Sequence, residues 1–268
     1  ETRSGLRILS PAQAAGLDIL TDGAQVTLAD GAVIKSQLVV GTDGGDSWTR
    51  REAGISARTS EYRQLGVVAN FDIGQAHRGV AYQWFRNDGV LAMLPLPGNR
   101  ASMVWSVAEE RAQALLALDA EALADTVAGA CQHVLGELRL ITPAAGFPLR
   151  LTHVASLIAP RVALAGDAAH NVHPLAGQGV NLGLRDVREL TAVLRGRAPR
   201  QDCGDLPLLR RYERSRREDI AAIELSTDAL QKLFGAQSVW VSGARNIGLN
   251  VINRLPPLKN MLIRHAVA

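Results

Sequence analysis

The alternation of apolar and polar residues near the N-terminus predicts a small β-meander. Its apolar positions are Leu17, Ile19, Val26, Leu28 and Val33. Asp-Gly pairs at residues 22–23 and 30–31 separate these short runs. Asp-Gly between apolar runs favours tight hairpin turns, because glycine accepts a positive φ at little steric cost.

Two later runs lack this alternation. Residues 38–40 and 161–165 are nearly continuous apolar stretches, a pattern typical of strands covered on both faces in a parallel sheet. The first leads into Gly41-Thr42-Asp43-Gly44-Gly45, and the second leads into Gly166-Asp167-Ala168-Ala169-His170. Ligands of open α/β sheets bind at the carboxyl ends of the strands, so both of these segments are candidate ligand positions.

The chain between these two runs has longer strand candidates. They cover residues 66–71, 79–86, 90–96 and 101–107, and helices are predicted at about 109–118 and 120–136. After Gly177 the pattern is helical, first over residues 180–194. Breaks follow near Pro199, Gly235, Gly243 and Pro256-Pro257.

These patterns predict a mixed α/β (α+β) fold with two lobes. The first lobe is an incomplete doubly wound α/β unit, entered twice by the chain, over residues 1–57 and 158–268, with a helical C-terminal region from about residue 196. The second lobe, residues 58–157, is a mixed β-sheet with helices on one side.

The composition is that of a globular protein and indicates the cellular compartment. The 268 residues are 47% hydrophobic, 21% charged and 4% aromatic, which argues against disorder and coiled coils. No apolar run reaches the length of about 18 residues that a membrane helix needs, and no secretory signal pattern occurs. Cys131 and Cys203 lie far apart, so neither a disulfide framework nor a zinc ligand set is indicated. We therefore expect a cytoplasmic protein.

Positive charge gathers toward the C-terminus. Residues 195–268 contain 13 Lys or Arg and 7 Asp or Glu, although the net charge of the chain is only +3. This excess indicates either a solvated helical face or attraction to acidic lipid headgroups or an acidic partner protein. Nucleic acid is not expected as a partner, because no recognition motif accompanies the charge.

Asp43 and Asp167 carry the first candidate chemistry. Each follows an apolar strand and stands beside a glycine, Gly44 or Gly166. A carboxylate in this position can accept hydrogen bonds from ligand hydroxyls, and the neighbouring glycine lets a ligand approach the backbone. The alternative is that both are ordinary Asp-Gly turns.

A glycine-rich segment follows the second aspartate. Gly177-Gln178-Gly179 precedes the predicted helix 180–194, so free N–H groups and the positive end of the helix dipole would favour an anionic ligand group. The spacing G-x-G-x-x-x-G and the lack of a directly preceding strand exclude a dinucleotide fingerprint.

The same region allows two other arrangements on sequence alone. Asp167, His170 and His173 could bind a metal, but Pro174 removes the simple one-face argument, and no metal is expected. Ser47, His170 and Asp167 could form a hydrolase triad, but no G-x-S-x-G elbow occurs.

The motifs resemble those of flavin-dependent aromatic hydroxylases. Residues 41–50, Gly-Thr-Asp-Gly-Gly-Asp-Ser-Trp-Thr-Arg, are similar to G-A-D-G-x-x-S-x-x-R, and residues 166–170 are similar to the second FAD motif of the family. His173 to Asp186 fits H-P-L-A-G-Q-G-x-N-x-G-x-x-D, which is typical of the UbiH-type branch of ubiquinone biosynthesis. Residues 245–249, 254–256 and 258–259 also resemble that branch.

One family motif is absent from the sequence. Family members begin with a βαβ unit whose G-x-G-x-x-G loop holds the ADP pyrophosphate, and none of the 268 residues supplies that loop. The chain also begins with Glu1 rather than Met. We therefore expect an N-terminally truncated chain of a longer enzyme.

The resemblance implies the cofactors and the activity. NAD(P)H would reduce FAD, and the reduced flavin would use O₂ to hydroxylate the aromatic ring of a polyprenyl phenol. The first lobe would be a partial FAD-binding domain, and the second would bind the substrate. The implied cofactor-binding residues are Asp43, Gly44, Gly166, Asp167, Pro174, Gly177, Gln178, Gly179 and Asn181.

The resemblance also implies a substrate pocket and partners. Candidate pocket residues are Trp84, Met93, Leu94, Pro95, Leu96 and Trp105, although apolar residues on a strand can equally be plain core. A polyprenyl phenol resides in the bilayer, so peripheral contact with the inner membrane or with a ubiquinone-biosynthesis complex is expected. The alternatives are a flavin hydroxylase of a soluble phenol and a catalytically silent assembly or lipid-contact module.

Overall fold

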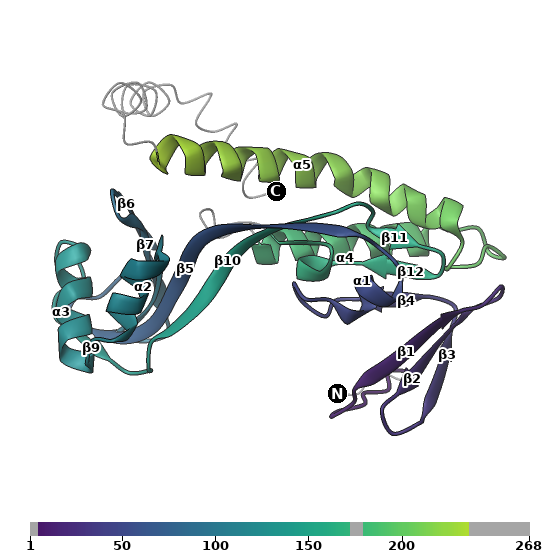
Figure 1. Ribbon diagram of the computed structural model, residues 1–268, viewed down its shortest axis with the longest axis horizontal. Helices are drawn as coiled ribbons and strands as arrows, with labels where there is room; N and C mark the ends of the chain where they lie inside the picture. The colour runs from purple at the N-terminus through teal and green to yellow at the C-terminus, as the bar shows by residue number, and fades with distance from the viewer. Residues whose placement is uncertain (1–4, 172–178, 236–268) are drawn as a thin grey trace. The chain divides into compact units, whose positions relative to one another are not determined.

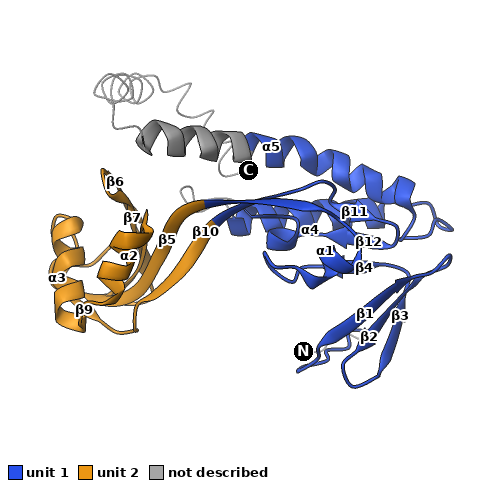
Figure 2. Ribbon diagram, viewed as in Figure 1, with its two compact units in different colours: residues 1–61, 150–224 blue, residues 62–149, 225–268 orange. Residues whose placement is uncertain are grey.

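The computed structural model describes residues 5–171 and 179–235, and these residues divide into two compact units. One unit combines residues 1–61 with residues 150–224, and the other is built on residues 62–149 (Figure 2). The chain passes from one unit to the other within two long strands, β5 (Ala57–Ile73) and β10 (Ala145–Val154). The mixed α/β class expected from the sequence is confirmed.

The first unit begins with the predicted β-meander. Strands β1 (Ala14–Ile19), β2 (Ala24–Leu28) and β3 (Val33–Ser36) form an antiparallel sheet in the order β1-β2-β3 (Figure 1). Each Asp-Gly pair stands between two successive strands. The turn at Asp30 is further closed by its carboxylate, which accepts a hydrogen bond from the Ala32 N–H at 2.9 Å.

A second small sheet of the first unit contains the two continuous apolar runs. β4 (Val39–Gly41) pairs in parallel with β12 (Val162–Leu164), and β11 (Ile158–Ala159) pairs antiparallel with β12. The remaining elements of this unit are α1 (Trp48–Glu52), the 3₁₀ turn η1 (Gly166–Ala168), β13 (His170–Asn171), α4 (Gly179–Arg195) and α5 (Leu206–Gly235). The two runs are parallel neighbours, as a parallel sheet requires, but β4 is not covered on both faces, because Val40 is 41% exposed.

The second unit is an antiparallel sheet packed against two helices. Its strands pair in the order β10-β5-β8-β7-β6, and β9 pairs with β5. The remaining strands are β6 (Tyr82–Arg86), β7 (Gly89–Leu96), β8 (Arg100–Ala108) and β9 (Leu138–Leu140). The helices are α2 (Glu109–Leu116) and α3 (Ala120–Ala130).

Period-2 alternation decides which strand residues of this unit reach its core. Alternate residues are buried in the second half of β5, in the middle of β7 and along β8, and Leu115 of α2 and Leu123 of α3 belong to the same apolar cluster. The fully buried strand residues of this cluster are Val67, Phe71, Leu91, Met103, Trp105 and Val107. The intervening residues lie on the opposite face of the sheet.

The structure differs from the sequence analysis at two places in this unit. Strands β9 and β10 were not predicted, and α3 ends at Ala130 rather than near residue 136. Gln132 and His133 both adopt positive φ, of 56° and 54°, which a continuing α-helix excludes. The chain therefore turns after Cys131 and enters β9.

Candidate functional site

The segments that contain Asp43 and Asp167 begin at the same edge of one sheet. β4 and β12 are parallel neighbours, with Gly41 opposite Leu164. The Ala165 N–H donates to the Gly41 carbonyl at 3.0 Å, which keeps the two chains side by side as they leave the sheet. The structure thus confirms that both segments start at one sheet edge, where open α/β sheets bind ligands.

Asp43 stabilises the turn into α1. Its carboxylate accepts hydrogen bonds from the Ser47 hydroxyl at 2.6 Å and from the Thr49 N–H at 2.8 Å. Ser47 in turn caps α1 by accepting the Arg50 N–H at 3.0 Å. Partial burial raises the pKa of Asp43, but these hydrogen bonds outweigh burial and hold the pKa below its usual value. Asp43 is therefore ionised at neutral pH, and its cofactor role stays a prediction.

Arg50 joins the two segments. Its side chain is buried, and Nη2 donates to the Gly45 carbonyl at 2.7 Å while Nη1 donates to the Ala168 carbonyl at 2.9 Å. One guanidinium thus spans residues that are more than one hundred positions apart in the sequence. The sequence analysis placed Arg50 at the end of the first motif but gave it no role, because its second partner is set by tertiary structure.

The second segment presents an open carboxylate. Asp167 lies in η1, is exposed, and has no hydrogen-bond or ion-pair partner among the described residues. Gly44 and Gly166 adopt positive φ, of 84° and 63°, and no atom lies within 4 Å of where a Cβ would stand at either position. A carboxylate that no described residue pairs with, next to the open glycine backbone of residue 166, fits a ligand that carries several hydroxyl groups, such as the ribityl chain of FAD.

The other implied cofactor residues belong to the start of α4 or precede it. Gly179 is the first residue of α4, and Asn181 is exposed in its first turn. A helix N-terminus has free N–H groups and the positive end of the helix dipole, which suits an anionic ligand group. Pro174, Gly177 and Gln178 lie outside the described residues.

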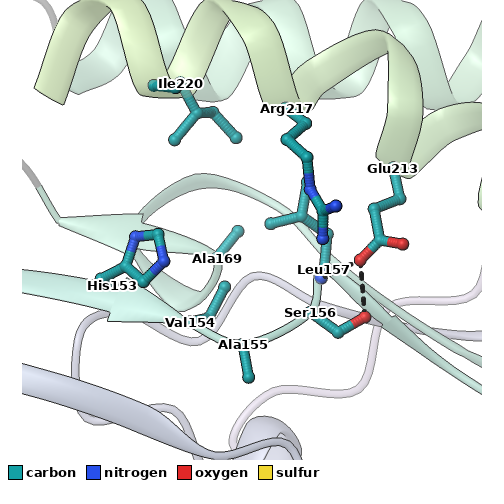
Figure 3. A pocket seen from close by; sticks show the side chains of 10 residues that line it. His153, Val154, Ala155, Ser156, Leu157, Ala169, Glu213, Arg217 and Ile220 are labelled. Atoms are coloured by element: carbon teal, nitrogen blue, oxygen red, sulfur yellow. Dashed lines mark hydrogen bonds between the residues drawn. The ribbon is translucent and has the colours of Figure 1, made fainter. Parts of the chain in front are cut away.

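Helix α5 is hydrogen-bonded to the strand that leads into this site. The Tyr212 hydroxyl donates to the Leu164 carbonyl at 2.7 Å. Glu213 accepts the Ser156 hydroxyl at 2.6 Å and the Leu157 N–H at 3.1 Å, at the rim of a cavity of about 250 Å³ (Figure 3). These contacts fix the end of β12 and the turn before β11 to one helix.

The candidate pocket residues of the second unit divide between the two faces of its sheet. Met93 and Trp105 are fully buried in the core against α2 and α3, and Trp84 packs on that core. This placement differs from the expected pocket lining, because alternation along β7 and β8 turns these side chains toward the helices. Leu94 is 40% exposed on the opposite face, and Pro95 and Leu96 are half-buried.

The opposite face has further half-buried residues that the sequence analysis missed. Ala92 pairs with Val104, and Leu94 pairs with Ser102, so these four side chains share one face. The period-2 alternation along β7 was the sequence signal that could have identified this face. Once Met93 is assigned to the core, its neighbours Ala92 and Leu94 must face the other way.

Metal ligation and membrane spanning are two further possibilities for the described part of the chain. There, no group of three or more His, Cys, Asp or Glu side chains could hold a metal ion. None of the helices described combines the length and apolarity needed to cross a membrane.

The chain is similar to two proteins of ubiquinone biosynthesis. It is 39% identical to the ubiquinone hydroxylase UbiL of Rhodospirillum rubrum over 97% of the chain and 61% of that protein. It is 34% identical to the human mitochondrial ubiquinone biosynthesis monooxygenase COQ6 over 90% of the chain and 59% of that protein. The chain therefore spans about 60% of the length of each relative.

A solved structure and a family model agree with this likeness. The crystal structure of pqsL, a probable FAD-dependent monooxygenase from Pseudomonas aeruginosa, has a TM-score of 0.68 and 26% identity, covering 84% of this chain and 64% of that one. The family model described as FAD binding domain matches residues 12–226, which include both segments joined by Arg50. The chain therefore belongs to the FAD binding domain family.

Proposed function

We propose that this chain is part of an FAD-dependent monooxygenase that hydroxylates the aromatic ring of a polyprenyl phenol in ubiquinone biosynthesis, using NAD(P)H and O₂. The relatives UbiL and COQ6 are a ubiquinone hydroxylase and a ubiquinone biosynthesis monooxygenase, and they support the substrate class. Since the chain spans about 60% of each of them, the activity is a proposal for the whole protein.

One observation carries the proposal. Arg50 holds two segments together at one sheet edge, and the exposed carboxylate of Asp167 lies in the second of them with no partner among the described residues. When bound, FAD supplies the redox chemistry that activates O₂ for insertion into the ring. The chain's own residues would bind and orient it: Asp167 would accept ribityl hydroxyls, and the α4 N-terminus would favour negative charge.

The open face of the second unit supplies a candidate substrate surface. Ala92, Leu94, Ser102 and Val104 lie on the face of the sheet opposite the packed core. This face combines apolar side chains with one hydroxyl, as a phenol ring with an apolar tail requires. We infer that this face, rather than Met93 or Trp105, contacts the substrate.

A flavin titration tests the cofactor assignment. Increasing amounts of the chain should quench FAD fluorescence in a saturable way, and Asp167→Ala should weaken binding at least about tenfold, because hydroxyl groups lose a charged acceptor. Asp18→Ala is the matched control, since Asp18 is an exposed aspartate of β1 in the same unit. Undiminished FAD binding by Asp167→Ala would contradict the site, and no saturable binding by the unaltered chain would favour a catalytically silent module.

Product analysis with the whole protein tests the substrate class. Prenylated and unprenylated phenols of the same ring pattern would be compared for NAD(P)H consumption and hydroxylated product. We expect a higher kcat/KM with the prenylated phenol, because burial of each CH₂ contributes about 0.8 kcal/mol. Equal or better turnover of the unprenylated phenol would favour a hydroxylase of soluble phenols.

Peripheral contact with a membrane surface is a second proposal, based on α5. Arg210, Arg211, Arg214 and Arg217 are exposed on this helix, and none has a hydrogen-bond or ion-pair partner in the described part of the chain. Basic residues near an anionic bilayer contribute about 1 kcal/mol each. We expect sedimentation with vesicles that contain anionic lipid, weakened by salt and by replacing Arg210, Arg214 and Arg217 with Gln. Equal sedimentation with zwitterionic vesicles would contradict an electrostatic contact.

A further inference from the structure

A fully buried carboxylate joins four elements of the first unit. Asp186, in the middle of α4, accepts the Gly166 N–H at 2.9 Å and the ring Nε2 of His170 at 2.6 Å on one oxygen. Its other oxygen accepts Nε of Arg216, from α5, at 2.8 Å. Because a carboxylate only accepts, the proton of this His170 contact is on Nε2. The start of η1, β13, α4 and α5 therefore meet at one side chain.

The buried anion of this cluster faces a buried cation, Arg216. Asp186 and the Arg216 side chain are 0% and 1% exposed, and Arg216 also donates through Nη1 to Asp219 at 2.6 Å. Burial raises the pKa of Asp186, but the hydrogen bonds from His170 and Arg216 outweigh it and lower the pKa below its usual value. The anion is thus maintained at neutral pH, where it can hold the Gly166 N–H.

Helix α4 also touches the same turn through bare backbone. A Cβ at Gly183 would lie 3.2 Å from the Cα of Gly166, closer than nearly all side-chain contacts of this kind. Gly183 stands almost one helical turn before Asp186, so both residues face η1. Residue 166 is therefore fixed to α4 at two points, by a close backbone contact and by a hydrogen bond.

We propose that Asp186 is a positioning residue that sets the place of the Asp167 carboxylate relative to the N-terminal end of α4. Asp167 directly follows the amide that Asp186 holds, and Gly179 begins the helix about 10 Å along its axis from Asp186. These are the two ends of the flavin site, so this inference rests on the proposed function. Arg216 acts through Asp186, and it extends the same control to α5.

A second ion pair of this unit, between a buried arginine and a half-buried aspartate, offers a control. Arg161 pairs with Asp202 and also donates to the carbonyls of Thr21, at 2.7 Å, and Gln37, at 3.3 Å. This pair connects the meander, the approach to β4 and the loop before α5. Loss of the Asp202 charge should destabilise the unit without a direct effect on η1.

Gly183→Ala separates positioning from general stability. Alanine has the higher helix propensity, which offsets part of the cost of its close contact with Gly166, so α4 itself should stay folded in this variant. A positioning role predicts that the added Cβ displaces Gly166 and weakens the site. Asp186→Asn is the second variant, since it keeps the shape of the side chain but removes the anion from Arg216 and from the Gly166 amide.

Amide hydrogen exchange on the chain itself gives the first readout. We expect exchange at Gly166 to Ala169 to rise at least tenfold in Asp186→Asn and Gly183→Ala, and to change less than twofold in Asp202→Asn. The same rate change in Asp202→Asn, or no change in the other two variants, would overturn the inference.

FAD affinity gives the second readout. We expect the Kd of the whole protein for FAD to rise at least tenfold in Asp186→Asn and Gly183→Ala, with Asp202→Asn within twofold of the unaltered protein. Faster exchange with unchanged affinity would overturn the inference and leave the proposed function standing. The expected exchange pattern without any saturable FAD binding by the whole protein would instead contradict the proposed function, and the positioning of the turn would stand.

Discussion

Replacing Arg50 by methionine removes the bridge between the two motif segments while keeping an apolar side chain of similar length. The variant loses the hydrogen bonds to the Gly45 carbonyl at 2.7 Å and to the Ala168 carbonyl at 2.9 Å. Ala168 is fully buried, so its carbonyl cannot turn to water, whereas the half-buried Gly45 can regain part of its solvation. The loss therefore acts mainly through one unsatisfied buried acceptor and the separation of the two segments.

The expected loss of unfolding free energy in Arg50→Met follows from these two hydrogen bonds. A hydrogen bond from a charged donor contributes about 1.5–3 kcal/mol, and partial resolvation at Gly45 offsets some of the second bond. We expect Arg50→Met to lower the free energy of unfolding by about 2–4 kcal/mol. For a chain of this size, the corresponding fall in Tm is about 5–15 °C.

Unfolding in urea, followed by circular dichroism, measures this change. Arg51→Met is the matched control, because Arg51 is the exposed neighbour with one hydrogen bond, to the Asp46 carbonyl at 2.6 Å. The control should lose no more than about 0.5 kcal/mol. A free energy of unfolding for Arg50→Met within that range of the Arg51→Met value would refute the bridging role. Arg50→Lys should fall between the two, since one ammonium lacks the planar fork that reaches both carbonyls.

Three further predictions concern pH, backbone strain and packing. The pKa of Asp186 is lowered in the folded chain. The unfolding free energy that the unaltered chain has in excess of Asp186→Asn should therefore be constant above the pKa of an unfolded aspartate, about 3.9, and should shrink as the pH falls below that value. Urea unfolding at several pH values measures this difference. Gly166→Ala should lose about 1–2 kcal/mol of unfolding free energy through left-handed strain alone, because its Cβ meets open space; no loss would contradict the positive φ. Phe71→Ala should lose about 3–5 kcal/mol and Leu94→Ala less than about 1 kcal/mol, because only Phe71 is in the core; equal losses in thermal unfolding would contradict the assignment of faces.

Much of the fold could be predicted where local chemistry decides it. The Asp-Gly pairs gave the turns of the meander, and the continuous apolar runs at residues 38–40 and 161–165 gave two parallel strands. The glycines and aspartates after those runs marked the sheet edge. Each of these features depends on neighbours in the sequence, such as glycine at positive φ or the absence of alternation in a strand covered on both faces.

The strands that were not predicted depend on distant partners. β10 contains Gly146 and Pro148, which weaken a strand pattern, yet it pairs in the sheet with β5 and, at Thr152 and His153, with β13. β9 has only three residues and is stabilised by its pairing with Phe71 to Ile73 of β5. Pairing over such distances overrides local propensity, because the hydrogen bonds are supplied by another part of the chain.

The candidate site also combines features that the local sequence decides with features that distant contacts decide. The sequence by itself determined that Asp43 and Asp167, with the glycines beside them, each follow a strand, because strand ends and glycine turns are local features. Only the tertiary structure decided that Arg50 reaches Ala168, that Asp186 meets His170 and Arg216, and that Trp105 faces the core. A guanidinium or carboxylate acts over about 3 Å, and which groups come that close depends on the packing of helices and loops far apart in the chain.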